Sequence, residues 1–76
     1  MTQEQIKRAK WVWFSRTTKA LQASKRDGGK VLAIVKNVGF MRSGCEWQTV
    51  DGTKGCDYLP TTAMKAARAA LLAVTP

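Results

Sequence analysis

The stretch from Thr2 to Leu21 constrains the fold most, because its hydrophobic residues recur with a helical period. Thr2 is a good N-cap, and Gln5 stands three residues later, as in a capping box. At 3.6 residues per turn, such a stripe predicts a helix packed against a core. The sequence Asp27-Gly28-Gly29 disfavours a helix, so we expect this first helix to end near Lys25. The stripe consists of Ile6, Ala9, Trp13, Phe14, Thr17, Ala20 and Leu21.

Basic side chains and one tryptophan lie off this stripe. Lys7 and Trp11 are four residues apart, so they would be neighbours on a helix surface, flanked by Arg8 and Lys19. Cations of this kind neutralise phosphates, and an indole can stack on a base. The structural alternative has equal weight: Trp11 folds over the helix edge onto the last helix, or makes a cation–π contact with Lys7.

The rest of the chain predicts three strands and a second helix. Residues 30–40 are rich in β-branched side chains, and residues 45–50 and 55–59 follow after turns at 41–44 and 51–54. Pro60 should stop the sheet, and Thr61 or Thr62 should cap an alanine-rich helix over residues 63–74. The expected fold is α+β with the order α-β-β-β-α, in which two helices pack on one face of a three-stranded antiparallel meander. We expect a single small basic domain spanning residues 1–76.

The two turns predict which side chains share a face of the sheet. If Phe40 opposes Cys45 and Val50 opposes Gly55, the strands collect a largely apolar core face. That face would hold Leu32, Ile34, Lys36, Val38, Phe40, Cys45, Trp47, Thr49, Cys56 and Tyr58. The outer face would hold Val31, Ala33, Val35, Asn37, Glu46, Gln48, Val50 and Asp57. Its row of three small hydrophobic residues allows a homodimer through this face, although scattered apolar side chains are normal on surfaces.

The charge distribution favours an anionic partner. The formal net charge is +8, and residues 1–26 carry seven basic side chains and one acid. Nucleic acid and an acidic protein surface both fit such a field. Binding to a membrane surface is disfavoured because the apolar stripe of the first helix is committed to a core. No signal peptide and no membrane-spanning run is visible, so we expect a cytoplasmic protein.

Few residues suit catalysis or metal binding. The chain has no histidine and two cysteines, so a four-ligand zinc site within one chain cannot form, and we expect no metal, no cofactor and no enzymatic activity. Cys45 and Cys56 fit the role of small buried hydrophobic residues. In the expected register their Cα atoms would be roughly 13 Å apart, too far for a disulfide.

The element order resembles that of double-stranded-RNA-binding domains, and the segment AMKAARAAL is similar to their closing helix. The chain departs from that family at Thr61 and Thr62, where the family has a lysine pair, and it lacks a Gly-Pro-x-His loop. We therefore assign no family. The resemblance implies only that such a scaffold can bind a duplex by its shape.

The leading hypothesis is a non-enzymatic module that binds DNA or RNA. The alternative is a small inhibitor or adaptor, of the type that phages and mobile elements encode, which docks its basic face on an acidic or nucleic-acid-binding surface of a larger protein. The candidate contact residues are the same for both: Lys7, Arg8, Trp11, Arg16, Lys19, Lys25, Arg26, Lys65 and Arg68.

Overall fold

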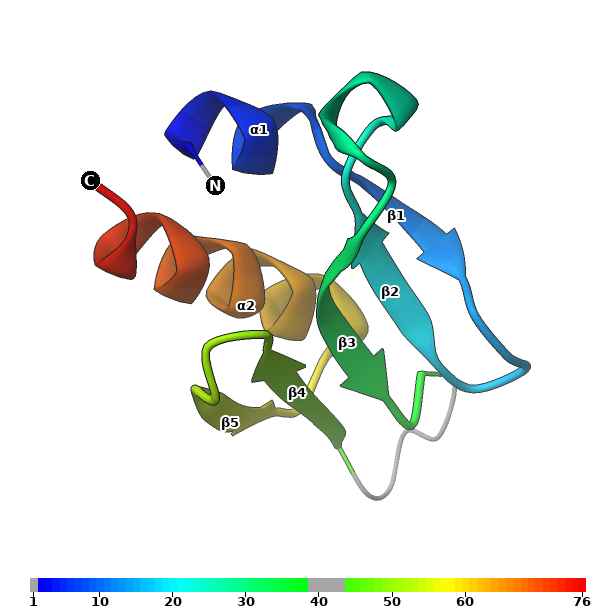
Figure 1. The fold of residues 1–76 in the computed structure, drawn as a ribbon. Helices are drawn as coiled ribbons and strands as arrows, with labels where there is room; N and C mark the ends of the chain where they lie inside the picture. Colours follow the sequence, from blue (N-terminus) through cyan, green and yellow to red (C-terminus); the bar gives the residue numbers. More distant parts are fainter. Residues whose placement is uncertain (1, 39–43) are drawn as a thin grey trace.

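The computed structural model describes residues 2–38 and 44–76, which form a five-stranded antiparallel sheet with a long helix across one face (Figure 1). The strands follow the chain order β1-β2-β3-β4-β5 across the sheet. The α+β class and the meander are therefore confirmed, whereas the expected number of three strands is wrong. The elements are α1 (Gln3–Arg8), β1 (Lys10–Trp13), β2 (Lys19–Gln22), the 3-10 turn η1 (Lys25–Asp27), β3 (Val31–Lys36), β4 (Cys45–Thr49), β5 (Lys54–Asp57) and α2 (Pro60–Val74).

Helix α1 begins as the sequence predicts. The backbone N–H of Gln5 donates to Thr2 Oγ1 at 3.2 Å, and the backbone N–H of Thr2 donates to Gln5 Oε1 at 2.8 Å, which completes the capping box. The helix does not reach Lys25, because Ala9 already has an extended backbone. The aromatic and β-branched residues that follow have high strand propensity, and here they pair with a second strand.

The region expected to be the second half of a helix is a β-hairpin. Strands β1 and β2 pair with Trp11 opposite Leu21 and Trp13 opposite Lys19. Four residues of the expected stripe are nevertheless buried: Ile6, Ala9, Ala20 and Leu21. Trp13 and Phe14 are exposed instead, because the hairpin carries them beyond the helix that covers the sheet.

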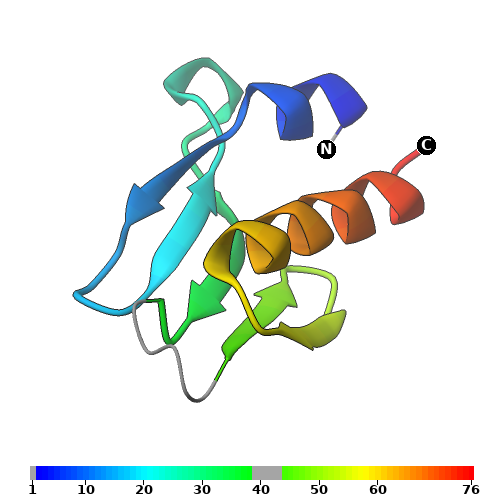
Figure 2. The ribbon, with the colours of Figure 1, turned by 180° about the vertical axis from the view of Figure 1, so that it is seen from behind.

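The predicted closing helix is confirmed as α2, but it begins at Pro60 and is not capped by Thr61 or Thr62. Leu59 is its N-cap, and Pro60 occupies the first turn, where a missing N–H costs nothing. Ala63, Ala67 and Leu71 recur every four residues and form its buried stripe. Seen from behind, α2 lies in front of the sheet with α1 above it (Figure 2). It contacts β3, β4 and β5, which leaves the β1–β2 hairpin projecting to one side. Of the helices in residues 2–38 and 44–76, none is long and apolar enough to cross a bilayer.

The core has two neighbouring parts that share two tryptophans. One part joins α1, β2 and α2 through Ile6, Leu21 and Leu71, and the other contains Val35, Val38, Cys45 and Ala63. Trp11 and Trp47 are half-buried and pack against both. The prediction that Trp47 belongs to the core is supported, while the prediction that Trp13 is a core residue and Trp11 a surface residue is wrong.

Both pairings of β4 differ from the expected register by three residues, which exchanges the faces of β3 and β5. Ala33 pairs with Thr49 and Val35 with Trp47, so these β3 side chains face α2. Trp47 in turn pairs with Gly55, which places Cys56 on the face away from α2. We call that uncovered side the open face. The expected outer row of Val31, Ala33 and Val35, which suggested a homodimer, is therefore not a surface row, since Ala33 and Val35 are buried. Phe40 and the expected turn at Met41, Arg42 and Ser43 lie outside the described residues.

Candidate functional site

The nine predicted contact residues do not form one surface. Lys7 and Arg8 lie on α1, while Lys25 and Arg26 lie on η1. Arg16 and Lys19 belong to the tip of the β1–β2 hairpin, and Lys65 and Arg68 belong to α2. Trp11 is no longer a helical neighbour of Lys7, because it lies in β1 and packs on the core. Two of the predicted cations, Arg8 and Lys25, do line one hollow beside β1, together with Lys10.

Arg8 is held in an ion pair. Its Nη2 lies 2.9 Å from Asp27 Oδ1, and its Nε donates to Asp27 Oδ2 at 3.2 Å. The Ser24 hydroxyl donates to the same carboxylate at 2.9 Å. The hydrogen bond with Asp27 raises the pKa of Arg8, and the bond from Arg8 holds the pKa of Asp27 below its usual range. Arg8 therefore joins α1 to η1 and has little capacity left for an external anion.

Arg68 also has an internal partner. Its Nη2 donates to the carbonyl oxygen of Ala9 at 2.7 Å, so α2 is connected to the end of α1. A cation is favourable there, because the carbonyl groups at a helix C-terminus carry partial negative charge. Arg68 thus stabilises the arrangement of the two helices.

The β1–β2 hairpin presents aromatic and basic side chains to solvent. Trp13 is 60% exposed and Phe14 is 72% exposed, which is unusual for side chains of this size. The ammonium group of Lys19 lies 4.7 Å from the centroid of the Trp13 ring. Arg16 is exposed in the connecting loop. We call Trp13, Phe14, Arg16 and Lys19 the hairpin site.

Backbone hydrogen bonds fix the tip of the hairpin. The N–H groups of Phe14 and Ser15 both donate to the carbonyl oxygen of Thr18, at 2.9 and 3.1 Å. The N–H of Val38 donates to the carbonyl oxygen of Thr17 at 2.8 Å, which ties the loop to the end of β3. The exposed aromatic rings are therefore carried on an anchored loop. Trp13 pairs with Lys19, which pairs with Val35, so Trp13 lies on the α2 side of the sheet; Phe14 follows it at the start of the connecting loop.

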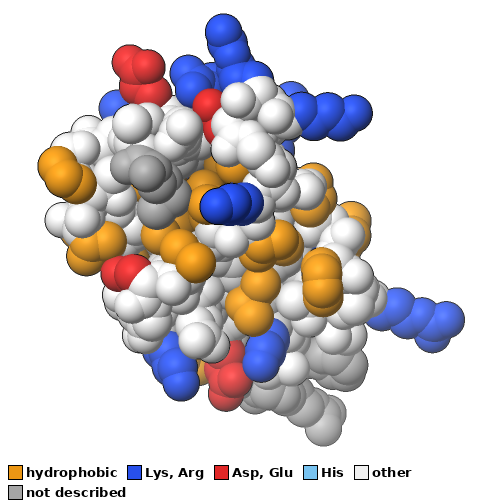
Figure 3. Space-filling model, in the orientation of Figure 1, with side chains coloured by type: hydrophobic (Ala, Val, Ile, Leu, Met, Phe, Trp, Pro, Cys, Tyr) orange, Lys and Arg blue, Asp and Glu red, His pale blue; other side chains and the backbone are white. Residues whose placement is uncertain are grey.

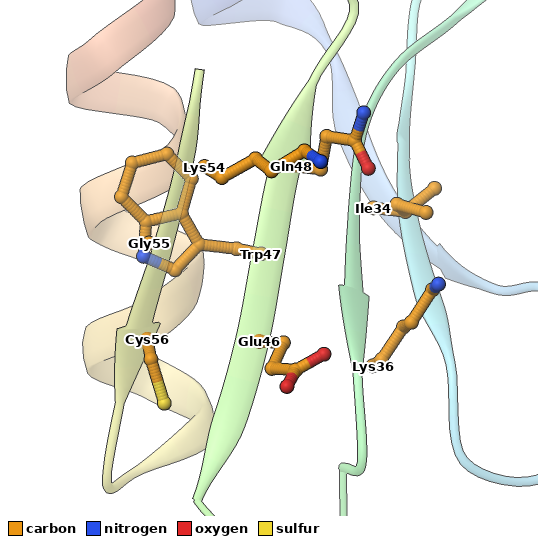
Figure 4. Close-up of a pocket in the computed structure, with 8 residues that line it drawn as sticks. All are labelled: Ile34, Lys36, Glu46, Trp47, Gln48, Lys54, Gly55 and Cys56. Atoms are coloured by element: carbon orange, nitrogen blue, oxygen red, sulfur yellow. The ribbon is translucent and has the colours of Figure 1, made fainter. Parts of the chain in front are cut away.

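The open face has a hollow of about 470 Å³ over β3, β4 and β5. Figure 4 shows the Lys54 side chain running across β4 beside Gln48, with the Gln48 amide over β3 near Ile34. Lys36, Glu46 and Cys56 follow each other across the three strands at the next level. In Figure 3, hydrophobic side chains gather along the middle of this face, and most Lys and Arg side chains stand at its margins.

Several of these residues were missed from the sequence. Lys36, Gln48 and Lys54 became neighbours only through the strand register, which no local pattern reveals. Phe14 was assigned to the core stripe. The alternation of large residues in Trp11-Val12-Trp13, followed by Ser-Arg-Thr-Thr, was the available signal for a hairpin.

Comparison with protein-family models, curated proteins and solved structures gave no match to this chain. Its function must therefore be inferred from the geometry of its own residues.

Proposed function

We propose that this protein is a non-enzymatic nucleic-acid-binding domain that contacts its ligand through the hairpin site. The observation that carries the proposal is the Trp13–Lys19 pair: an indole that is 60% exposed, with an ammonium group 4.7 Å from its ring centroid. An aromatic ring beside a cation matches the two parts of a nucleotide, since the ring stacks on a base and the cation neutralises a phosphate.

The free energy of the exposed Trp13 ring favours a role in ligand binding. A large apolar ring loses free energy by remaining in water, and the same ring gains about 1 to 3 kcal/mol per stacked base. Trp13 remains 60% exposed beside Lys19, so its ring has surface available for a base. The neighbouring Arg16 and the overall charge of +8 add attraction for phosphates.

The acidic residues support a binding role rather than a catalytic one. Asp57 accepts a hydrogen bond from Trp47 Nε1 at 3.0 Å, and Asp51 accepts hydrogen bonds from the hydroxyl groups of Thr49 and Thr53. Asp27 is paired with Arg8. These three carboxylates are thus used to hold turns and side chains in place.

As part of this proposal, we place the protein in the cytoplasm. Cys45 and Cys56 are both free thiols, and Cys56 is exposed. An unpaired exposed thiol persists most readily in a reducing compartment.

The test is a titration of labelled single-stranded and duplex DNA and RNA, followed by fluorescence anisotropy. We expect Trp13→Ala to weaken binding by about tenfold, which corresponds to one lost stacking contact. Trp13→Tyr should restore part of the loss, because it keeps an aromatic ring. Tyr58→Ala is the matched control, since Tyr58 is 66% exposed but follows β5 at the other edge of the sheet. Absence of binding by the wild-type protein, or equal affinities of wild type and Trp13→Ala, would contradict the proposal.

A second candidate is a protein-binding inhibitor or adaptor. It is favoured by one observation: β1 is an edge strand, and its end carries Val12, Trp13 and Phe14 as consecutive exposed apolar residues. A partner strand could pair with such an edge and cover these side chains. Capture of one defined protein from lysate, unchanged by nuclease treatment and lost with Trp13→Ala, would support this candidate instead.

A further inference from the structure

We infer that the open face of the sheet is a path for single-stranded nucleic acid, which runs from Phe14 at the hairpin across Lys36 and Gln48 to Lys54. This inference rests on the proposed function and specifies the form of its ligand. It is tested at Lys36 and Lys54, which lie on β3 and β5 outside the hairpin site, so its failure can be separated from failure of the hairpin site.

Two lysine side chains flank the central strand of the open face. Lys36 on β3 and Lys54 on β5 lie on either side of β4, and both are exposed. From a strand spacing of about 4.8 Å and a diagonal offset of two residues, their Cα atoms are about 12 Å apart. Two long, mobile ammonium groups at this separation can reach successive phosphates along one strand. The hollow of about 470 Å³ lies between them.

The side chains between the two lysines suit base edges. Ile34 provides an apolar floor, the Gln48 amide offers both a donor and an acceptor, and the Glu46 carboxylate offers an acceptor. These are the groups that bind base edges, whereas phosphates prefer cations. The acidic Glu46 lies on the central strand of the hollow, where a base rather than a phosphate would face it.

An exposed aromatic ring stands at the start of the path. Phe14 is 72% exposed and directly follows Trp13, the last residue of β1. A stacked duplex hides the faces of its bases, while a single strand offers them to an aromatic side chain. From β1 to β5 the path crosses four strand spacings, or about 19 Å, which suits an oligonucleotide longer than about four nucleotides.

The experiment compares two charge-matched double variants. Lys36→Glu with Lys54→Glu alters the path, and Lys25→Glu with Lys65→Glu makes the same charge change on η1 and on α2. Each is titrated against a labelled 12-nucleotide single strand and the duplex of the same sequence, at several salt concentrations. All four side chains are exposed, and circular dichroism checks that each variant keeps the fold.

We expect the path variant to bind the single strand about tenfold more weakly than the control variant. Its log–log salt slope should be smaller than that of wild type by about 1.4, because two single-strand phosphate contacts are lost. Phe14→Ala should also weaken single-strand binding, because it removes an exposed ring on which a base can stack. Wild type should prefer the single strand to the duplex.

Three results would overturn the inference. If the two double variants bind equally well and Trp13→Ala still weakens binding, the hairpin function stands and the path is wrong. If wild type binds duplex as tightly as single strand, the ligand form is wrong. If wild type binds neither form, both proposals fail. In that case, a wild-type dimer in solution that is dissociated by the double variant Lys36→Glu with Lys54→Glu would assign the open face to contact with a second copy of the chain.

Discussion

The indole ring of Trp47 lies directly over Gly55, its partner across the β4–β5 pairing. A Cβ atom at position 55 would collide with Cε2, Cζ2 and Nε1 of that ring. The absence of a side chain at Gly55 therefore allows Trp47 to reach Asp57, to which its Nε1 donates a hydrogen bond at 3.0 Å. The small residue is required by a close approach of a ring, not by the conformation of the backbone.

Gly55→Ala should consequently destabilise the protein. The added methyl group must displace Trp47, which loses packing against both parts of the core and its bond to Asp57, at a cost of about 1 to 3 kcal/mol. Urea unfolding monitored by tryptophan fluorescence measures this cost. Cys56→Ala is the control, because the neighbouring Cys56 is exposed; an unchanged midpoint for Gly55→Ala would show that Trp47 does not hold this position.

Replacement of Trp11 should destabilise the protein much more than replacement of Trp13. Trp11→Ala removes a side chain that packs against both parts of the core, and we expect a loss of about 3 kcal/mol, the lower end of the range for buried tryptophan. Trp13→Ala should cost less than about 1 kcal/mol, because it removes an exposed ring and its contact with Lys19. Thermal unfolding of both variants checks the assignment, and equal losses would refute it.

Asp27 should make stability depend on pH. Its side chain is only 5% exposed, and the hydrogen bond from Arg8 lowers its pKa in the folded protein. The folded state therefore favours the carboxylate: this contribution is complete above the unfolded pKa of about 4 and is lost as pH falls through the lowered folded value. Asp27→Asn should lower the urea midpoint at pH 7 and change it much less at pH 3. Arg8→Gln should have the same pH pattern, and a variant effect that is independent of pH would argue against the ion pair.

The two thiols should react at different rates. Burial raises the pKa of Cys45, and the nearby Cys56 and Asp57 raise it further, so little thiolate forms at pH 8. Cys56 is exposed on the open face. Iodoacetamide followed by mass spectrometry should give one adduct per native chain, at Cys56, and two adducts in urea. Cys56→Ser should give none under native conditions; rapid labelling of Cys45 in that variant would contradict its burial.

The absence of a disulfide was predicted correctly, but for a wrong reason. Cys56 lies opposite Glu46, so the Cα atoms of Cys45 and Cys56 are close, at about 6 Å, and not 13 Å apart. The two side chains point to opposite faces of the sheet, which keeps the sulfur atoms apart. The expected separation of 13 Å was wrong because it was calculated from a β4–β5 register that the structure does not have.

The register error has a definite cause at the β4–β5 turn. The N–H of Thr49 donates to the carbonyl oxygen of Thr53, and Gly52 has a φ of 95°, so three residues connect the strands. A three-residue loop with a left-handed glycine is a standard hairpin connection. The four-residue turn assumed from the sequence pairs Gly55 with Val50, whereas Gly55 pairs with Trp47, three residues earlier. A shift by an odd number of residues exchanges the faces of β5. Similarly, β3 ends at Lys36 because Asn37 adopts a φ of 63°, four residues before the expected end.

Features that depend on local chemistry could be predicted from the amino-acid sequence alone. They are the capping box of Thr2 and Gln5, the closing helix with its buried Ala63 and Ala67, and strand residues within 30–40, 45–50 and 55–59. The β1–β2 hairpin depends on long-range contacts instead, because two four-residue strands are too short for their periodicity to distinguish them from helical turns. The pairing of β2 with β3 and the position of α2 then buried Trp11 and exposed Trp13. Placement of the binding residues followed from these long-range contacts, since hydrogen bonding between distant strands determines which face each side chain occupies.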